Sequence, residues 1–316
     1  MGQRIRIWLR RIGRVVIVLI LTVTAASFVY NRMTVPPNEI EPGFGSYVRV
    51  GDASVHYQHW GTHGSPIVLV PGAFESSIVW QNVGPLLARN HRVYALDMSW
   101  YGYTRDISPI TLTGQAELLD GFIGALHLPR PLLVGHSMGA AVTARLALDH
   151  RQAVSGVVFA DGDARPIPIG NDAVRWVLHA FASATPYLTS VTRIMARWPS
   201  GAESMIRSVC GNPCPGLTPA LAKQWVRPLG QRSAVDALHS WFGGDSYGLT
   251  TDEISSIAVP TEIIWGDGDQ EGGTLQGAIA NLGHPPVYII KDAGHLSMLA
   301  NPAMFASAVE AAARTR

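Results

Sequence analysis

Short, largely apolar runs separated by polar turns recur along most of the chain. Six of them are four or five residues long: 67–70, 92–96, 131–134, 156–160, 262–265 and 287–290. Runs of this length are typical of strands covered on both faces, as in a parallel sheet. Ahead of them, residues 47–57 alternate loosely between apolar and polar positions, which predicts an antiparallel hairpin at the start of the sheet.

Helix-like segments lie between these runs, notably 113–126, 138–150 and 302–313. The alternation predicts an α/β fold with a doubly wound, mostly parallel sheet of eight strands, whose ligands bind at the carboxyl ends of the strands. Residues 164–250 break this rhythm, because they hold few strand-like runs and several helical stretches. We interpret them as a helical cap inserted into a core formed by residues 45–163 and 251–316.

The first 30 residues follow a different pattern. Residues 1–14 contain five arginines and no acid, and residues 15–30 carry no charge. As a helix, the uncharged stretch is about 24 Å long, and residues 12–14 extend it toward the roughly 30 Å of a bilayer core. We therefore expect residues 12–30 to span a membrane once, with the basic end in the cytoplasm and the catalytic domain on the extracytoplasmic side.

Two other interpretations of this segment remain open. Small residues at 24–27 suit a peptidase, so residues 1–30 could be a secretory signal peptide that is removed to leave a secreted protein. The remaining alternative is a buried core helix. Residues 31–44 hold three prolines and one glycine, which predicts a linker.

Composition and charge narrow the function classes. With 316 residues, 47% of them hydrophobic and 15% charged, the chain is neither disordered nor a coiled coil. The net charge is +1, and residues 31–316 hold 19 basic against 23 acidic residues, which argues against a nucleic-acid partner. The two cysteines, Cys210 and Cys214, exclude a disulfide scaffold and a four-cysteine zinc site. They are either free thiols or, in an oxidising compartment, a disulfide around a small loop.

The pattern Gly-x-Ser-x-Gly occurs twice, around Ser137 and around Ser246. Only Ser137 follows a predicted buried strand and opens a predicted helix, which is the setting of a nucleophile elbow. Flanking glycines allow the strand and the helix to approach each other at such a turn. Ser137 is therefore the candidate nucleophile.

A serine hydroxyl needs a base, and the base needs a carboxylate to orient it. His295 lies five residues after the last predicted strand, where a loop at the carboxyl edge of the sheet is expected. By contrast, His284 precedes that strand, and His136 cannot easily turn its side chain onto the adjacent serine. The sequence thus favours His295 as the base.

The acid is less tightly specified. Asp269 follows the strand at 262–265 in a Gly-Asp-Gly-Asp turn, and we favour it. Asp163 and Asp161 follow the preceding strand and are alternatives, because either location could bring a carboxylate to the histidine. Acyl transfer also needs backbone N–H donors for the oxyanion, for which we predict Met138 and Ala73. This chemistry requires neither a metal nor an organic cofactor.

Together these residues resemble the α/β-hydrolase fold superfamily, in particular its lid-bearing serine hydrolases of esterase and lipase type. The likeness covers residues 45–163 and 251–316, and it rests on the sequences GHSMG, GDGD and DAGHLSMLANP. The resemblance implies a serine hydrolase, because relatives that open epoxides or displace halide carry aspartate at the elbow. Two positions depart from the family pattern: Pro71 replaces a histidine common before the oxyanion-loop glycine, and Trp100 replaces a glycine.

Four tryptophans of the predicted cap indicate either an apolar pocket or packing of the cap onto the core: Trp176, Trp198, Trp225 and Trp241. We expect the protein to hydrolyse small apolar carboxylic esters. The same triad could instead cleave a carbon–carbon bond or an N-terminal proline peptide bond, or act as a cofactor-free perhydrolase. A non-catalytic binding protein is a further alternative. No obligate protein partner is evident from the sequence.

Overall fold

The computed structural model of the chain describes residues 2–99, 101–105, 110–166, 180, 185–243 and 247–315. Trp100, Trp176 and Ser246 lie outside the described residues, and so does the side chain of Trp241.

Eight strands form one sheet, as predicted, and their order is β1-β2-β4-β3-β5-β6-β7-β8. The pairs β1–β2 and β2–β4 are antiparallel, and all other pairs are parallel. Strands β3, β5 and β6 are buried at every position, which is why their sequences are continuously apolar. The strands span β1 Ser46–Val50, β2 Ala53–Trp60, β3 Pro66–Val70, β4 Arg92–Leu96, β5 Leu132–His136, β6 Gly156–Ala160, β7 Thr261–Gly266 and β8 Val287–Ile290.

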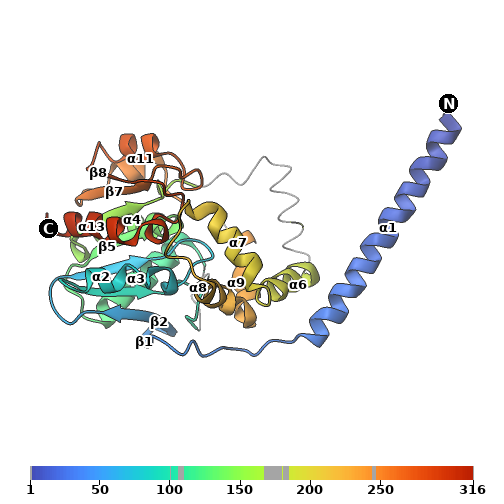
Figure 1. Cartoon of the computed structure of the whole chain (residues 1–316), viewed down its shortest axis with the longest axis horizontal. Helices are drawn as coiled ribbons and strands as arrows, with labels where there is room; N and C mark the ends of the chain where they lie inside the picture. Colours follow the sequence, from blue (N-terminus) through green and yellow to red (C-terminus); the bar gives the residue numbers. More distant parts are fainter. Residues whose placement is uncertain are drawn as a thin grey trace.

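Helices cover both faces of this sheet (Figure 1). In the sheet, β4 lies on one side of β3 and β5 lies on the other. The connections from β3 to β4 and from β4 to β5 therefore run in opposite directions across the sheet. Since both are right-handed, α2 and α3 lie on opposite faces. The helix α3 packs on α4, and α2 packs on α13. The core helices are α2 Gly84–Leu87, α3 Leu112–Ala125, α4 Met138–Asp149, α10 Thr251–Ser255, α11 Leu275–Asn281, α12 Ser297–Ala300 and α13 Pro302–Ala313. Short 3-10 turns are η1 Ser77–Trp80 and η2 Arg151–Ala153.

The described part of the segment between β6 and β7 is helical, as the broken strand rhythm predicts. It contains α6 Thr185–Met195, α7 Pro199–Cys210, α8 Pro219–Val226, η3 Arg227–Gly230 and α9 Ser233–Gly243. These helices gather beside the sheet, between it and the N-terminal helix (Figure 1). We call them the cap.

The N-terminal helix α1 runs from Gly2 to Met33 and projects away from the sheet (Figure 1). It is longer than the predicted span and occupies the first three residues of the predicted linker, because Pro36 and Pro37 are the first residues that prevent a helix. The part from Arg6 to Met33 is long and apolar enough to cross a membrane, and only 6% of its most apolar window is buried. This exposure excludes a buried core helix and leaves a membrane span or a signal sequence.

Candidate active site

Ser137 lies on the sharp turn between β5 and α4, at the carboxyl edge of the sheet. Its backbone has φ +51° and ψ −120°, a conformation that residues with a Cβ rarely adopt. The turn brings α4 close to the neighbouring strand β3, and Gly139 allows this approach because it has no side chain. A Cβ at this position would lie 2.6 Å from the Val70 carbonyl oxygen. The side chain is thereby presented at the top of the sheet, as the Gly-x-Ser-x-Gly pattern predicts.

The structure brings three predicted residues into one chain of hydrogen bonds. His295 Nε2 lies 2.9 Å from Ser137 Oγ. On the other side of the ring, His295 Nδ1 lies 3.0 Å from Asp269 Oδ1. The Asp269 side chain is fully buried, and that of His295 is 13% exposed. A histidine held in this way can accept the serine proton while the carboxylate fixes its tautomer.

Asp269 is arranged to remain charged. Burial alone would raise its pKa, but the hydrogen bond and charge of His295 and two backbone N–H groups lower it below the ordinary value. Those N–H groups belong to Glu271 and Gly272, at 2.8 Å and 3.3 Å from Oδ1. The turn after β7 therefore binds the ionised form of its aspartate.

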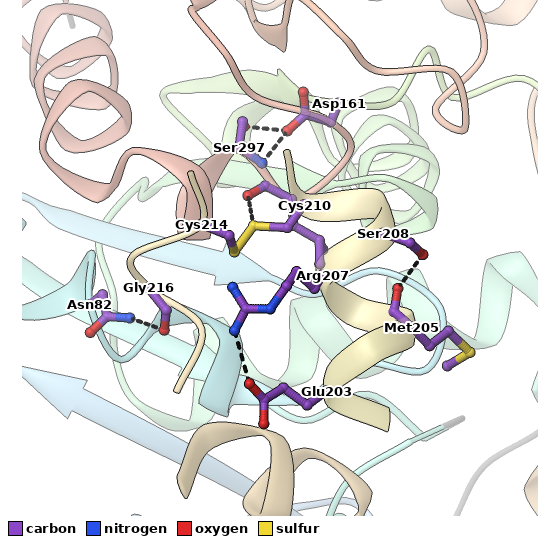
Figure 2. The surroundings of a disulfide bond; sticks show 11 residues. Asn82, Asp161, Glu203, Met205, Arg207, Ser208, Cys210, Cys214, Gly216 and Ser297 are labelled. Atoms are coloured by element: carbon purple, nitrogen blue, oxygen red, sulfur yellow. Dashed lines mark hydrogen bonds and ion pairs between the residues drawn. A yellow bond between two sulfur atoms is a disulfide. The ribbon is translucent and has the colours of Figure 1, made fainter. Parts of the chain in front are cut away.

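The two alternative acids lie elsewhere. Asp161 accepts the Gly266 N–H at 2.7 Å and the Ser297 hydroxyl, so it joins the end of β7 to the start of α12. The second of these contacts is seen in Figure 2. Asp163 forms an ion pair with Arg165, with 2.5 Å between Oδ2 and Nη2. Neither carboxylate hydrogen-bonds the side chain of His295 among the contacts of the described residues.

The loop after β3 carries the predicted oxyanion donor Ala73, and it is held against the nucleophile. A Cβ at Gly72 would lie 2.9 Å from the Ser137 Cβ. Met138, the second predicted donor, is the first residue of α4. The proposed oxyanion site thus lies between the loop and the helix N-terminus, and the donor roles themselves remain predictions.

Sequence reasoning missed a buried ion pair that supports this loop. Glu75 Oε2 accepts the Gly72 N–H at 2.7 Å and lies 2.9 Å from His136 Nδ1. His136 Nε2 lies 2.7 Å from the His295 carbonyl oxygen, so both ring nitrogens face acceptors and both carry protons. Burial would lower the pKa of His136, but Glu75 raises it to about 9. The charged His136 ring thus connects the loop after β3, the elbow of Ser137 and the loop of His295. In the sequence, the signal for this pair was an acid three residues after Gly72 and a histidine next to Ser137.

The cap contacts two parts of the site. Trp225 of α8 donates its Nε1–H to the carbonyl of Phe74 at 2.8 Å, directly after the predicted oxyanion donor. At the end of α7, Cys210 and Cys214 form a disulfide (Figure 2). The Cys210 carbonyl accepts the Gly294 N–H at 2.8 Å, next to His295. The cysteines are therefore paired, and their loop lies against the segment that carries the candidate base.

Beside Ser137 a pocket opens between the elbow and the turn after β6, and its wall includes Arg165 and Tyr247. Over the described ranges of the chain, no group of three or more His, Cys, Asp or Glu side chains could hold a metal ion. The arrangement offers a nucleophile, a base and an orienting carboxylate.

A family model for the alpha/beta hydrolase family matches residues 67–308. The chain belongs to this family. Because the match covers most of the chain and includes the elbow, the Asp269 turn and the His295 loop, the sequence resemblance is confirmed.

Several known members of the hydrolase family resemble the chain. A 2-hydroxy-6-oxo-6-(2'-aminophenyl)hexa-2,4-dienoic acid hydrolase of Metapseudomonas resinovorans is 27% identical over 284 residues, which are 83% of this chain and 88% of the relative. A thermophilic esterase from Thermogutta terrifontis is 21% identical, with a TM-score of 0.69 over 86% of this chain and 99% of that one. A bacterial membrane phospholipase A is also 21% identical, with a TM-score of 0.66 over 99% and 98% of the two chains. The two structural likenesses show a shared fold.

Proposed function

We propose that this hydrolase cleaves carboxylic esters through an acyl-enzyme formed on Ser137. His295 accepts the serine proton as the hydroxyl attacks the carbonyl carbon, and then donates it to the leaving alkoxide. Asp269 orients the ring and stabilises its charged form. The N–H groups of Ala73 and Met138 stabilise the oxyanion, and water releases the acid. The observation that carries the proposal is the continuous hydrogen-bond chain from Ser137 Oγ to the Asp269 carboxylate.

Removal of the nucleophile tests this proposal. Ser137→Ala should abolish labelling by a fluorophosphonate probe and lower kcat on short aryl esters by roughly 10⁵- to 10⁶-fold. The matched control is Ser246→Ala in the second Gly-x-Ser-x-Gly sequence, which should retain both labelling and turnover. Labelling that persists in Ser137→Ala would place the reactive serine elsewhere and refute the assignment.

Cleavage of a carbon–carbon bond beside a ketone is the second candidate, because one relative is named a hydrolase of a 2-hydroxy-6-oxo-dienoic acid. Such an acid carries a carboxylate, which an unpaired cation would bind best. Among the described residues that line the pocket beside Ser137, the cation is Arg165, and Asp163 already neutralises it. This pairing favours an uncharged ester. Turnover of a vinylogous diketone with negligible turnover of aryl esters would reverse the order of the two candidates.

We also propose that α1 stays attached as a membrane anchor, with the catalytic domain on the extracytoplasmic side. The C-terminal part of α1 packs on α6 of the cap. Asn31 donates to the Pro186 carbonyl at 2.8 Å, and Thr24 hydrogen-bonds Tyr187. Cleavage near residues 24–27 would remove the second contact. The membrane phospholipase A aligns with 99% of this chain, a span that includes α1, which also supports an anchor. The mass of the chain extracted from membranes tests whether residues 1–30 remain.

A further inference from the structure

Exposed large apolar side chains concentrate on one part of the catalytic domain. Among the described residues from 36 onward, six such side chains are exposed, and four of them belong to α6, α7 or the junction between these helices. We call these four the cap apolar face: Val191, Ile194, Trp198 and Met205, which are 41%, 48%, 60% and 56% exposed. The other two, Phe74 and Met304, lie on separate core segments. A concentration of this kind marks an interaction surface.

The four side chains lie along one stretch of the cap, from the C-terminal half of α6 through the junction to α7. Val191 and Ile194 are three residues apart on α6 and share one side of it, and Trp198 stands at the junction, directly before the first residue of α7. The Trp198 ring lies over Gly201, where a Cβ would come within 2.4 Å of it. Met205 follows Gly201 by one helical turn, so α7 continues the face.

This face borders the contact between the cap and α1. Tyr187 and Ser190, whose side chains hydrogen-bond α1, precede Ile194 on α6 by seven and four residues, and so share its side of the helix. The apolar side chains of α1 from Val15 to Val29 are themselves exposed. Figure 1 shows α6 beside the C-terminal part of α1, with α7 leading from there toward the sheet. The apolar surface of α1 and the cap apolar face are therefore neighbours.

The charges around the face fit an anionic surface. Residues 185–202 contain two arginines and no acid, and Arg197 is exposed next to Trp198. Arg32 is exposed at the adjoining end of α1. Glu203, the nearest acid in the sequence, is paired with Arg207 at 2.9 Å. Apolar side chains and a tryptophan rimmed by arginines match the boundary between lipid headgroups and acyl chains.

We infer that the cap apolar face docks on the surface of the bilayer that α1 crosses, with its side chains at the headgroup–acyl boundary. This inference rests on the membrane-anchor part of the proposed function. Docking holds the cap of each molecule against the lipid phase, so the site receives esters that partition into the bilayer. The arginines draw the face toward anionic lipid.

Fluorescence quenching tests the docking without catalysis. The full chain carrying Ser137→Ala is reconstituted into vesicles of phosphatidylcholine and phosphatidylglycerol with brominated acyl chains. Trp198→Phe should reduce the bromine-quenched emission, with Trp8 of α1 remaining as a quenched residue. Replacement of Val191, Ile194 and Met205 by serine should lower the quenching of Trp198. Trp60→Phe, in the strand β2, is the matched control and should leave the quenched emission unchanged.

Two outcomes would overturn the inference. Equal quenching in the Trp198→Phe and control chains would show that the face stays out of the lipid. Single cysteines can also be introduced on the cap apolar face. If they cross-link between two molecules while Trp198 emission is insensitive to bromine, a second copy covers the face. Either result leaves the proposed ester hydrolysis by Ser137 untouched. Absence of fluorophosphonate labelling in the unmutated enzyme would refute that hydrolysis and leave the docking result standing.

Discussion

The ends of β6 and β7 lie side by side in the sheet, and each is followed by two aspartates with very different surroundings. After β7, Asp269 binds the candidate base and two backbone N–H groups, and its pKa is lowered. After β6, burial raises the pKa of Asp161 to about 6, with His136 opposing that shift. Each carboxylate accepts three hydrogen bonds, so the number of donors does not separate them. Burial and the negative charge of Asp269 raise the pKa of Asp161, whereas the hydrogen bond and charge of His295 lower that of Asp269.

Position along the turn decides which aspartate reaches the histidine. Asp161 is the first residue after β6, and it accepts a hydrogen bond from the backbone of Gly266, the last residue of β7. Asp269 is the third residue after β7, on a turn whose Gly268 N–H binds the Ala293 carbonyl at 2.8 Å. That contact places the turn directly against the loop of His295. Three variants measure how far the two strand ends differ.

The largest effect is expected at Asp269. Asp269→Asn should lower kcat on aryl esters by about 10⁴-fold, because the amide no longer stabilises the imidazolium or fixes the productive tautomer. The fold should survive, since the side chain keeps its size. Asp267→Asn in the same turn, whose carboxylate lies 3.5 Å from Lys291 near the surface, is the control and should retain activity. A comparable loss in both variants would contradict the role given to Asp269.

An intermediate effect is expected at Asp161, and it should depend on pH. Its raised pKa means that the folded chain binds the proton more tightly than the unfolded chain. The corresponding stabilisation is complete below pH 3.8 and is lost as the pH rises through about 6. Asp161→Asn should cancel this change, on the order of 2–3 kcal/mol in the free energy of unfolding, and lower kcat by at most about tenfold. Denaturant unfolding from pH 4 to 7 checks it; parallel curves for the two chains would be inconsistent with a raised pKa.

The smallest effect is expected at Asp163. Its partner Arg165 has a side chain 38% exposed, so solvent weakens the pair. Asp163→Asn should change the free energy of unfolding by about 1 kcal/mol or less and aryl-ester turnover by no more than about threefold. It should also improve the binding of a substrate carboxylate, because Arg165 is then unpaired. A drop in kcat as large as that of Asp269→Asn would revive Asp163 as the catalytic acid.

Most of the sheet could be predicted from the sequence, because a strand that is buried on both faces consists of consecutive apolar residues. The run Val157–Ala160, for example, is apolar without interruption and fully buried. The predicted linker starts at residue 31, whereas α1 continues to Met33. The first residues that prevent a helix are Pro36 and Pro37, so the boundary follows from these prolines and not from the average composition of the linker. The hydrogen bond of Asn31 to the Pro186 carbonyl adds a long-range contact at this end of the helix.

The proximity of Ser137 and His295 could also be predicted, because each follows a recognisable strand. The sequence favours Asp269 as the partner of His295 but leaves Asp163 and Asp161 open, because the outcome depends on how two neighbouring turns face one histidine. The pair of Glu75 and His136 was missed for a related reason. A buried ion pair between residues 61 positions apart is visible only once the sheet has brought their loops together.

The disulfide between Cys210 and Cys214 relates the cellular compartment of the protein to the step at which its fold is completed. Both sulfurs are buried, and the intervening Gly211 pairs with Ala293, two residues before His295. Reducing conditions in the cytoplasm keep thiols apart, whereas oxidation follows export. With the extracytoplasmic location proposed above, the covalent brace beside the candidate base is added only after translocation, and a newly made chain completes the loop of His295 on the far side of the membrane.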